Sequence, residues 1–187
     1  AREVHAAWQN RSRIWCIFNA GRLVARLSET HPYLKDIHIH WFDLFWGGKA
    51  RLDFSFRSPV AILADDAMCL DGQAYAFVCP SGADRKKLIS ITKGFRKDYL
   101  RQAILAAGLI EEVLPDARRV TVIERFGAGH VIFRDDAGGA FELALCDLAD
   151  ARRLDLCLRN IGLALTELQE KGEKFSYIAA ILAHEGR

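Results

Sequence analysis

The sequence has one methionine and four prolines among its 187 residues, and it has no long apolar run. A membrane-spanning helix needs about 20 consecutive apolar residues, so no transmembrane helix is predicted within these residues. No secretory signal peptide is visible. The only methionine is Met68 and the chain begins with Ala1. We therefore expect a further segment before residue 1, and a single-pass membrane anchor is one candidate.

Motifs that carry catalysis or phosphate binding are also missing. No Gly-x-Ser-x-Gly sequence is present, which argues against a nucleophile elbow. Gly47-Gly48-Lys49 and Gly127-Ala128-Gly129 lack the Lys-Ser/Thr pair and the strand-to-helix context of a P-loop, so both are predicted to be turns. The acidic pairs Glu111-Glu112 and Asp135-Asp136 are adjacent in sequence and frame no cleft. We expect no catalytic site, no cofactor and no enzyme activity.

The cysteines are odd in number and form no Cys-x-x-Cys pair, which predicts neither a zinc site nor a redox motif. They are Cys16, Cys69, Cys79, Cys146 and Cys157. All have apolar neighbours, where a free thiol packs as a small hydrophobic group. We expect free cysteines, which argues against an oxidising compartment.

Charge and histidine content exclude further classes. The net charge of +2 does not favour a nucleic-acid-binding protein, which needs a sustained basic face. A basic cluster from Arg85 to Arg101 is open to two interpretations, a surface for an acidic partner or lipid headgroup and, preferred, a solvated helix face. His38 and His40 project to one face of a predicted strand. Two ligands are fewer than zinc requires, so no metal is expected.

The hydrophobic periodicity predicts an α+β protein of two domains. A helix is expected from about Ile14 to Leu27, followed by paired strands at 36–42 and 50–57. The further elements expected are short strands near 60–63, 67–70, 74–78 and 88–91, a helix at 95–114, strands at 120–125, 130–134 and 140–145, a helix at 148–170, and an apolar strand at 175–182. The boundary is placed at Pro59. The first domain is small, and the second has a mixed or antiparallel sheet with two long helices.

An aromatic stretch ends the first predicted strand. Trp41, Phe45 and Trp46 lie beside a glycine turn, and adjacent rings such as the last two cannot both face one core. Exposed aromatic clusters often mark interaction sites. A core role and a contact surface both remain open for this stretch.

Several local patterns occur in a specific order along the chain. They are Pro32-Tyr33-Leu34 with Ile37, Phe56 to Ala61 around Pro59, Leu70-Asp71 to Phe77, and Gly172 with Phe175-Ser176-Tyr177-Ile178. In this order they resemble the periplasmic part of the bacterial cell-division family FtsQ/DivIB. That resemblance implies a POTRA-like domain at 1–59, whose first strand appears to be missing, and an FtsQ-type β domain at 60–187.

The resemblance also implies a function. It implies a non-enzymatic scaffold on the periplasmic side of the inner membrane that binds the small division proteins FtsB and FtsL. The apolar final strand independently predicts a sheet edge that can accept another strand. The expected partner-binding residues are Phe175, Tyr177, Ile178, Ala179, Ala180, Ile181 and Leu182. Ala180 is expected to face outward with its backbone, so Ala180→Pro is expected to abolish partner binding; the register is open by one residue, so Ala179→Pro belongs in the same test.

Two alternative functions stay open at this point. One is another POTRA-containing component of an assembly or secretion system, which differs only in its partner. The other is a cytoplasmic α+β enzyme with an unrecognised site, which the predicted free cysteines favour. An apolar span directly before Ala1 would support the scaffold.

Overall fold

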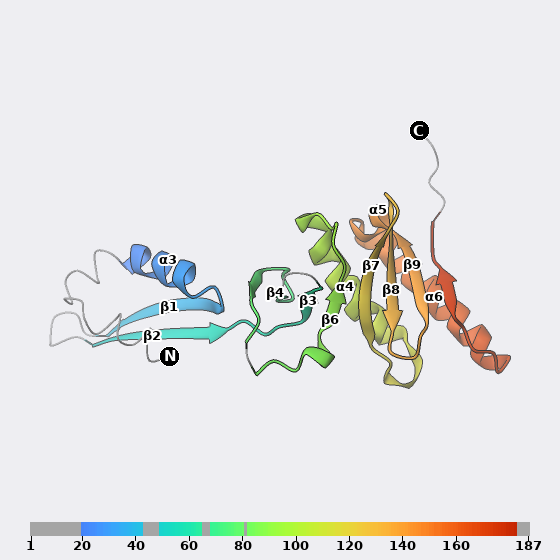
Figure 1. Cartoon of the computed structure of the whole chain (residues 1–187), viewed down its shortest axis with the longest axis horizontal. Helices are drawn as coiled ribbons and strands as arrows, with labels where there is room; N and C mark the ends of the chain where they lie inside the picture. The colour runs from blue at the N-terminus through green and yellow to red at the C-terminus, as the bar shows by residue number, and fades with distance from the viewer. Residues whose placement is uncertain (1–19, 43–48, 65–67, 81, 183–187) are drawn as a thin grey trace. The chain divides into compact units, whose positions relative to one another are not determined.

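The computed structural model describes residues 20–42, 49–64, 68–80 and 82–182. The protein is α+β, as the sequence predicts, and it divides into two compact units, Ala1–Ser58 and Pro59–Arg187. Each unit is considered by itself below (Figure 1).

The first unit consists of a helix on a β-hairpin. Helix α3 (Ala20–Thr30) lies along strands β1 (Leu34–Phe42) and β2 (Lys49–Phe56), which pair antiparallel. The helix continues three residues beyond the predicted Leu27 and ends before Pro32, whose ring disfavours helical backbone at the residue before it. Residues 14–19 of the predicted helix lie outside the described part.

Leucines of the helix form the small core of this unit. Leu23 and Leu27 are one helical turn apart and are buried with Leu34 of β1. Ile39 and Leu52, directly opposite each other in the hairpin, pack against these three residues. The helix covers one face of the strand pair because the apolar side of the helix packs against the apolar side of the strands.

The second unit is built on a mixed eight-stranded sheet in the order β10-β9-β8-β7-β6-β3-β4-β5. The strands are β3 (Ala61–Leu63), β4 (Met68–Leu70), β5 (Ala76–Val78), β6 (Ile89–Ile91), β7 (Val120–Phe126), β8 (His130–Asp135), β9 (Ala140–Ala144) and β10 (Tyr177–Ala179). β7, β8 and β9 form the predicted antiparallel meander, whereas β6 runs parallel to both β3 and β7. Gly127-Ala128-Gly129 is the turn between β7 and β8, as predicted.

The helices differ from the prediction at one place. α4 (Lys97–Val113) matches the first long helix and α6 (Ala151–Glu170) matches the second, but α6 starts three residues later than predicted, and a short helix that was not predicted, α5 (Leu145–Leu148), precedes it. α6 starts at Ala151 because the Asp150 carboxylate accepts hydrogen bonds from the Arg152 and Arg153 backbone N–H groups at 2.9 and 3.3 Å. Asp150 is thus an N-cap that starts a new helix.

The two faces of the sheet have different roles. Ile123 of β7, Phe133 of β8 and Phe141 of β9 are fully buried in one core with residues of α4 and α6. Side chains alternate along a strand, so the neighbours of these residues in each strand project from the opposite face of the sheet. Glu124 and Arg134, on that face, form an ion pair of 2.9 Å.

The prediction of free cysteines is wrong for one pair. Cys69 of β4 and Cys79, directly after β5, form a disulfide with a Cα–Cα distance of 4.9 Å. The hairpin brings them together, since Cys69 lies opposite Phe77 in the antiparallel register. Of the described cysteines, Cys146 is exposed and Cys157 is buried, and neither forms a disulfide.

Candidate functional site: the edge strand β10

Strand β10 is one end of the eight-stranded sheet, and it is shorter than predicted. Regular pairing covers Tyr177–Ala179 instead of 175–182. It runs parallel to β9, with Tyr177 opposite Ala140 and Ala179 opposite Glu142. No strand of the described part of the chain lies on its other side (Figure 1).

Hydrogen bonds at its two ends define which backbone groups face β9. The Ala140 N–H donates to the Ser176 carbonyl at 3.1 Å, and the Ala180 N–H donates to the Glu142 carbonyl at 2.9 Å. Successive residues of a strand direct their backbone groups to opposite sides. Residues 176, 178 and 180 therefore face β9, and the N–H and C=O groups of Tyr177 and Ala179 face the open edge. The expectation for Ala180 is therefore wrong, because its N–H donates to β9, and Ala179 is the residue with outward-facing backbone groups.

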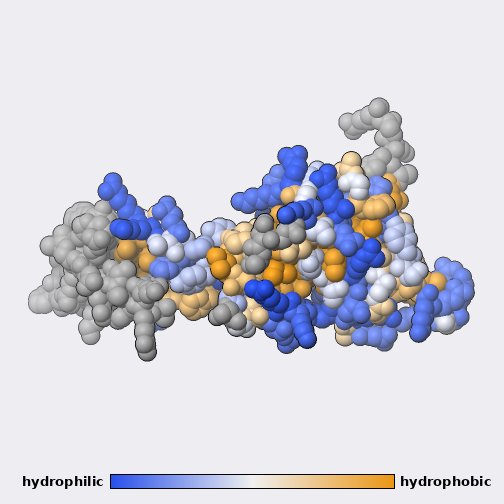
Figure 2. Space-filling view, viewed as in Figure 1, coloured by the Kyte–Doolittle hydropathy of each residue, from blue (hydrophilic) through white to orange (hydrophobic). Residues whose placement is uncertain are grey.

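Side-chain burial follows the same alternation. Ile178 and Leu182 pack against the core of the second unit, and Ala180 is only 5% exposed. Tyr177 and Ile181, from the alternate positions, are 50% and 43% exposed. Figure 2 shows hydrophobic surface where the chain leaves this strand. The predicted residues thus divide into an inward set that holds the strand and an outward set of Tyr177, Ala179 and Ile181.

Phe175 belongs to the inward set. Its ring lies 5.2 Å from the ring of Phe141, centroid to centroid, and the Arg118 guanidinium lies 5.4 Å from its centroid. Phe175 therefore anchors the segment that leads into β10, and its ring is placed for packing more than for contact with another molecule.

Polar side chains lie beside β10 on the sheet face away from the helices. The Glu142 carboxylate, 7% exposed, is 2.5 Å from His130 Nδ1 of β8. Ala179 is the β10 residue opposite Glu142. An added strand would place its alternate side chains along this polar face, beyond Tyr177 and Ala179.

The second predicted surface lies outside the side chains that the structure describes. The backbone of Trp41 lies in β1, whereas Phe45 and Trp46 lie outside the described residues. His38 and His40 are exposed, with ring centroids 6.5 Å apart, and His40 Nε2 is 3.4 Å from Asp53 Oδ2. Within the described ranges, no group of three or more His, Cys, Asp or Glu side chains is placed to bind a metal.

A buried ion pair that sequence reasoning missed supports the corner between α5 and α6. Arg153 Nε donates to the fully buried Asp147 carboxylate at 2.6 Å, and Cys157 Sγ lies 3.9 Å from the other carboxylate oxygen. Burial and the nearby Asp147 charge raise the pKa of the Cys157 thiol to about 11. Such a thiol stays protonated near neutral pH and is a poor nucleophile. We interpret these groups as structural.

No family model matches this sequence. No curated protein matches it at a significant level. In the described part of the chain, no helix has both the length and the apolar character that crossing a bilayer requires.

Proposed function

We propose that this protein is a non-enzymatic scaffold that accepts a strand of a partner protein along β10. The observation that carries the proposal is the outward direction of the Tyr177 and Ala179 backbone groups at a sheet edge. Such groups pair with an incoming strand by β-augmentation, and the neighbouring side chains supply specificity.

The resemblance to FtsQ/DivIB suggests the partners, which are the small single-span division proteins FtsB and FtsL. In this proposal the first unit is a POTRA-like domain and the second is the FtsQ-type β domain. The two units, the order of elements and a closing strand at a sheet edge agree with it. Trp41, Phe45 and Trp46 are proposed as a second contact surface.

The disulfide supports the proposed location on the periplasmic side of the bacterial inner membrane. Stable disulfides form in the periplasm and are rare in the cytosol of most organisms. The Cys69–Cys79 bond therefore removes the argument from free cysteines that favoured a cytoplasmic enzyme. Attachment to the membrane is assigned to an anchor outside these residues.

The test introduces proline at the outward position. Ala179→Pro removes an edge donor without removing a hydrogen bond to β9. We expect binding of the periplasmic segments of FtsB and FtsL from the same organism to fall at least about tenfold, measured by calorimetry. The midpoint of thermal unfolding should change little.

Two variants serve as controls. Ala179→Val keeps the donor and a strand-compatible backbone, so it should bind normally. Ala180→Pro removes the inward donor to Glu142 at a buried site and should lower stability by about 1–3 kcal/mol. Normal binding by Ala179→Pro would show that β10 is not the interface, and Trp41, Phe45 and Trp46 would become the surface to test.

A further inference from the structure

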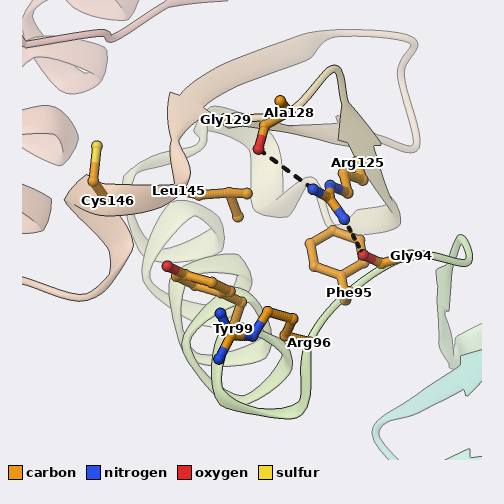
Figure 3. Close-up of a pocket in the computed structure, with 9 residues that line it drawn as sticks. All are labelled: Gly94, Phe95, Arg96, Tyr99, Arg125, Ala128, Gly129, Leu145 and Cys146. Carbon is orange, nitrogen blue, oxygen red and sulfur yellow. Dashed lines mark hydrogen bonds between the residues drawn. The ribbon is translucent and has the colours of Figure 1, made fainter.

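A cavity at the start of α4 lies outside the proposed interface. It has a volume of about 320 Å³ and is lined by the loop before α4, the first turn of α4, the end of β7, the β7–β8 turn and α5. A volume in this range suits a small organic ligand or one terminal residue of a peptide. Figure 3 shows residues from these segments around a common space, with the Cys146 side chain pointing away from it.

The Arg125 guanidinium, at the end of β7, is the charged group of this cavity that hydrogen bonds hold in place. It donates to the Gly94 carbonyl and, at 3.4 Å, to the Ala128 carbonyl (Figure 3). A guanidinium has five N–H donors, so these two bonds orient the group and leave further donors available. Carbonyl groups do not neutralise its charge, and no carboxylate of the described residues lies within ion-pair distance.

The charge of the cavity is consistently positive. Arg96 also lines the cavity, and the exposed Asp98 lies 3.9 Å from the Arg96 guanidinium, an ion pair that contributes little in water. None of the described residues that line the cavity carries a carboxylate. Of the basic cluster Arg85–Arg101, Arg96 lines the cavity with an exposed side chain, and the other basic residues of the cluster are exposed as a solvated face would be.

The remaining lining is apolar. Phe95 and Tyr99 are half-buried against the core, and Leu145 is buried. The thiol of Cys146 points away from the other lining residues (Figure 3), so it contributes no ligand-binding group. A ligand that fits this lining has an apolar body and a single anionic group.

The geometry points to a binding site for a carboxylate that is attached to an apolar group. Arg125 would bind the carboxylate through its free N–H groups, and Phe95, Tyr99 and Leu145 would contact the apolar part. This chemistry occurs in a free small acid and at the C-terminal residue of a peptide. The site does not depend on β10 or on its proposed partner.

The experiment titrates the protein with N-acetyl-phenylalanine and follows two-dimensional ¹H–¹⁵N spectra. The Gly94 and Gly129 amide signals should shift, with a dissociation constant on the order of 1 mM. The Tyr177 and Ala179 signals should not move, which separates this result from the β10 proposal. N-acetyl-phenylalaninamide, which lacks the charge, should bind about tenfold more weakly.

Matched variants locate the site. Arg125→Gln should weaken binding about tenfold, and Arg96→Gln should weaken it about threefold. Arg134→Gln, on the neighbouring strand and paired with Glu124, should have no effect. Two results would overturn the proposal. One is equal affinity for the acid and its amide. The other is that Arg125→Gln and Arg96→Gln bind the acid as tightly as the native protein does.

Two further ligands define the chemistry. Inorganic phosphate should bind more weakly than N-acetyl-phenylalanine, and equal binding would contradict a role for the apolar lining. The peptide Ala-Ala-Ala-Phe distinguishes the sources of the carboxylate. Tighter binding than that of the acetylated amino acid identifies a peptide terminus, and weaker binding identifies a free acid.

Discussion

The ring of Phe175 lies against the backbone of Gly139, so closely that no larger residue fits there. A Cβ atom at Gly139 would lie 2.7 Å from the ring Cζ and 2.8 Å from Asp135 Oδ2. Gly139 directly precedes β9, and Phe175 precedes β10 by two residues. The absence of a side chain at Gly139 therefore allows the segment before β10 to approach β9 and pair with it.

Gly139→Ala should destabilise the second unit because the added methyl group meets a ring and a buried carboxylate. Overpacking of this kind costs about 1–3 kcal/mol. Urea unfolding measures the loss. The Tyr177 and Ala179 amide signals should also shift as β10 is displaced.

The matched control is Gly162→Ala in α6, where a Cβ meets nothing within 4 Å. Alanine favours a helix over glycine by about 1 kcal/mol, so this variant should gain stability. Equal effects of the two substitutions would contradict the packing argument.

Loss of the Cys69–Cys79 bond should destabilise the β4–β5 hairpin. The cysteines are separated by 10 positions, and closing a loop of that size contributes about 2–3 kcal/mol. Cys79→Ala should lower the free energy of unfolding by this amount in non-reducing buffer. In dithiothreitol the native protein should lose most of its advantage over the variant. An unchanged difference in dithiothreitol would mean that the side chain at 79 matters for another reason.

The two cysteines of the described region that form no disulfide should differ in reactivity. In native protein at pH 8, iodoacetamide should modify exposed Cys146 and leave buried Cys157 intact. Peptide mass mapping distinguishes the two sites. In urea both should react, and rapid modification of Cys157 without urea would show that α6 opens locally.

Cys157 should also make stability depend on pH. Its pKa is raised to about 11 in the folded protein, whereas an unfolded thiol titrates near about 8.5. The folded state binds the proton more tightly, so the contribution is present below the unfolded pKa and is lost as pH rises towards 11. Between pH 8.5 and 10.5 the native protein should lose more stability than Cys157→Ala. Parallel curves would contradict the assignment.

Patterns within one element were predictable from the sequence, and contacts between distant segments were not. The alternation in 120–145 predicted the meander because burial on one face imposes period two. The short helix α5 and the exact start of α6 were missed, although Asp150 ahead of Ala151-Arg152-Arg153 is a recognisable N-cap pattern. The long apolar stripe of this helix hid the start.

The disulfide and the edge register required the paired strands. Cys69 and Cys79 lie on either side of the Asp71-Gly72 turn signal, two positions before Asp71 and seven after Gly72, so the sequence alone does not place them opposite each other. The outward direction of Ala179 depends on its pairing with Glu142, 37 positions away. The contact between Phe175 and Gly139 is likewise not indicated by any hydrophobic periodicity in either segment.

Because β10 pairs with β9 over a short stretch, the fraction of molecules in which β10 is docked on β9 affects the measured affinity for any partner. Only Tyr177–Ala179 pair regularly with β9, so undocking is a local equilibrium that need not unfold the sheet. If a partner strand binds only the docked form, the apparent dissociation constant is the intrinsic one divided by the docked fraction. A substitution at Phe175 or Gly139 that halves this fraction would therefore double the apparent dissociation constant without touching the partner.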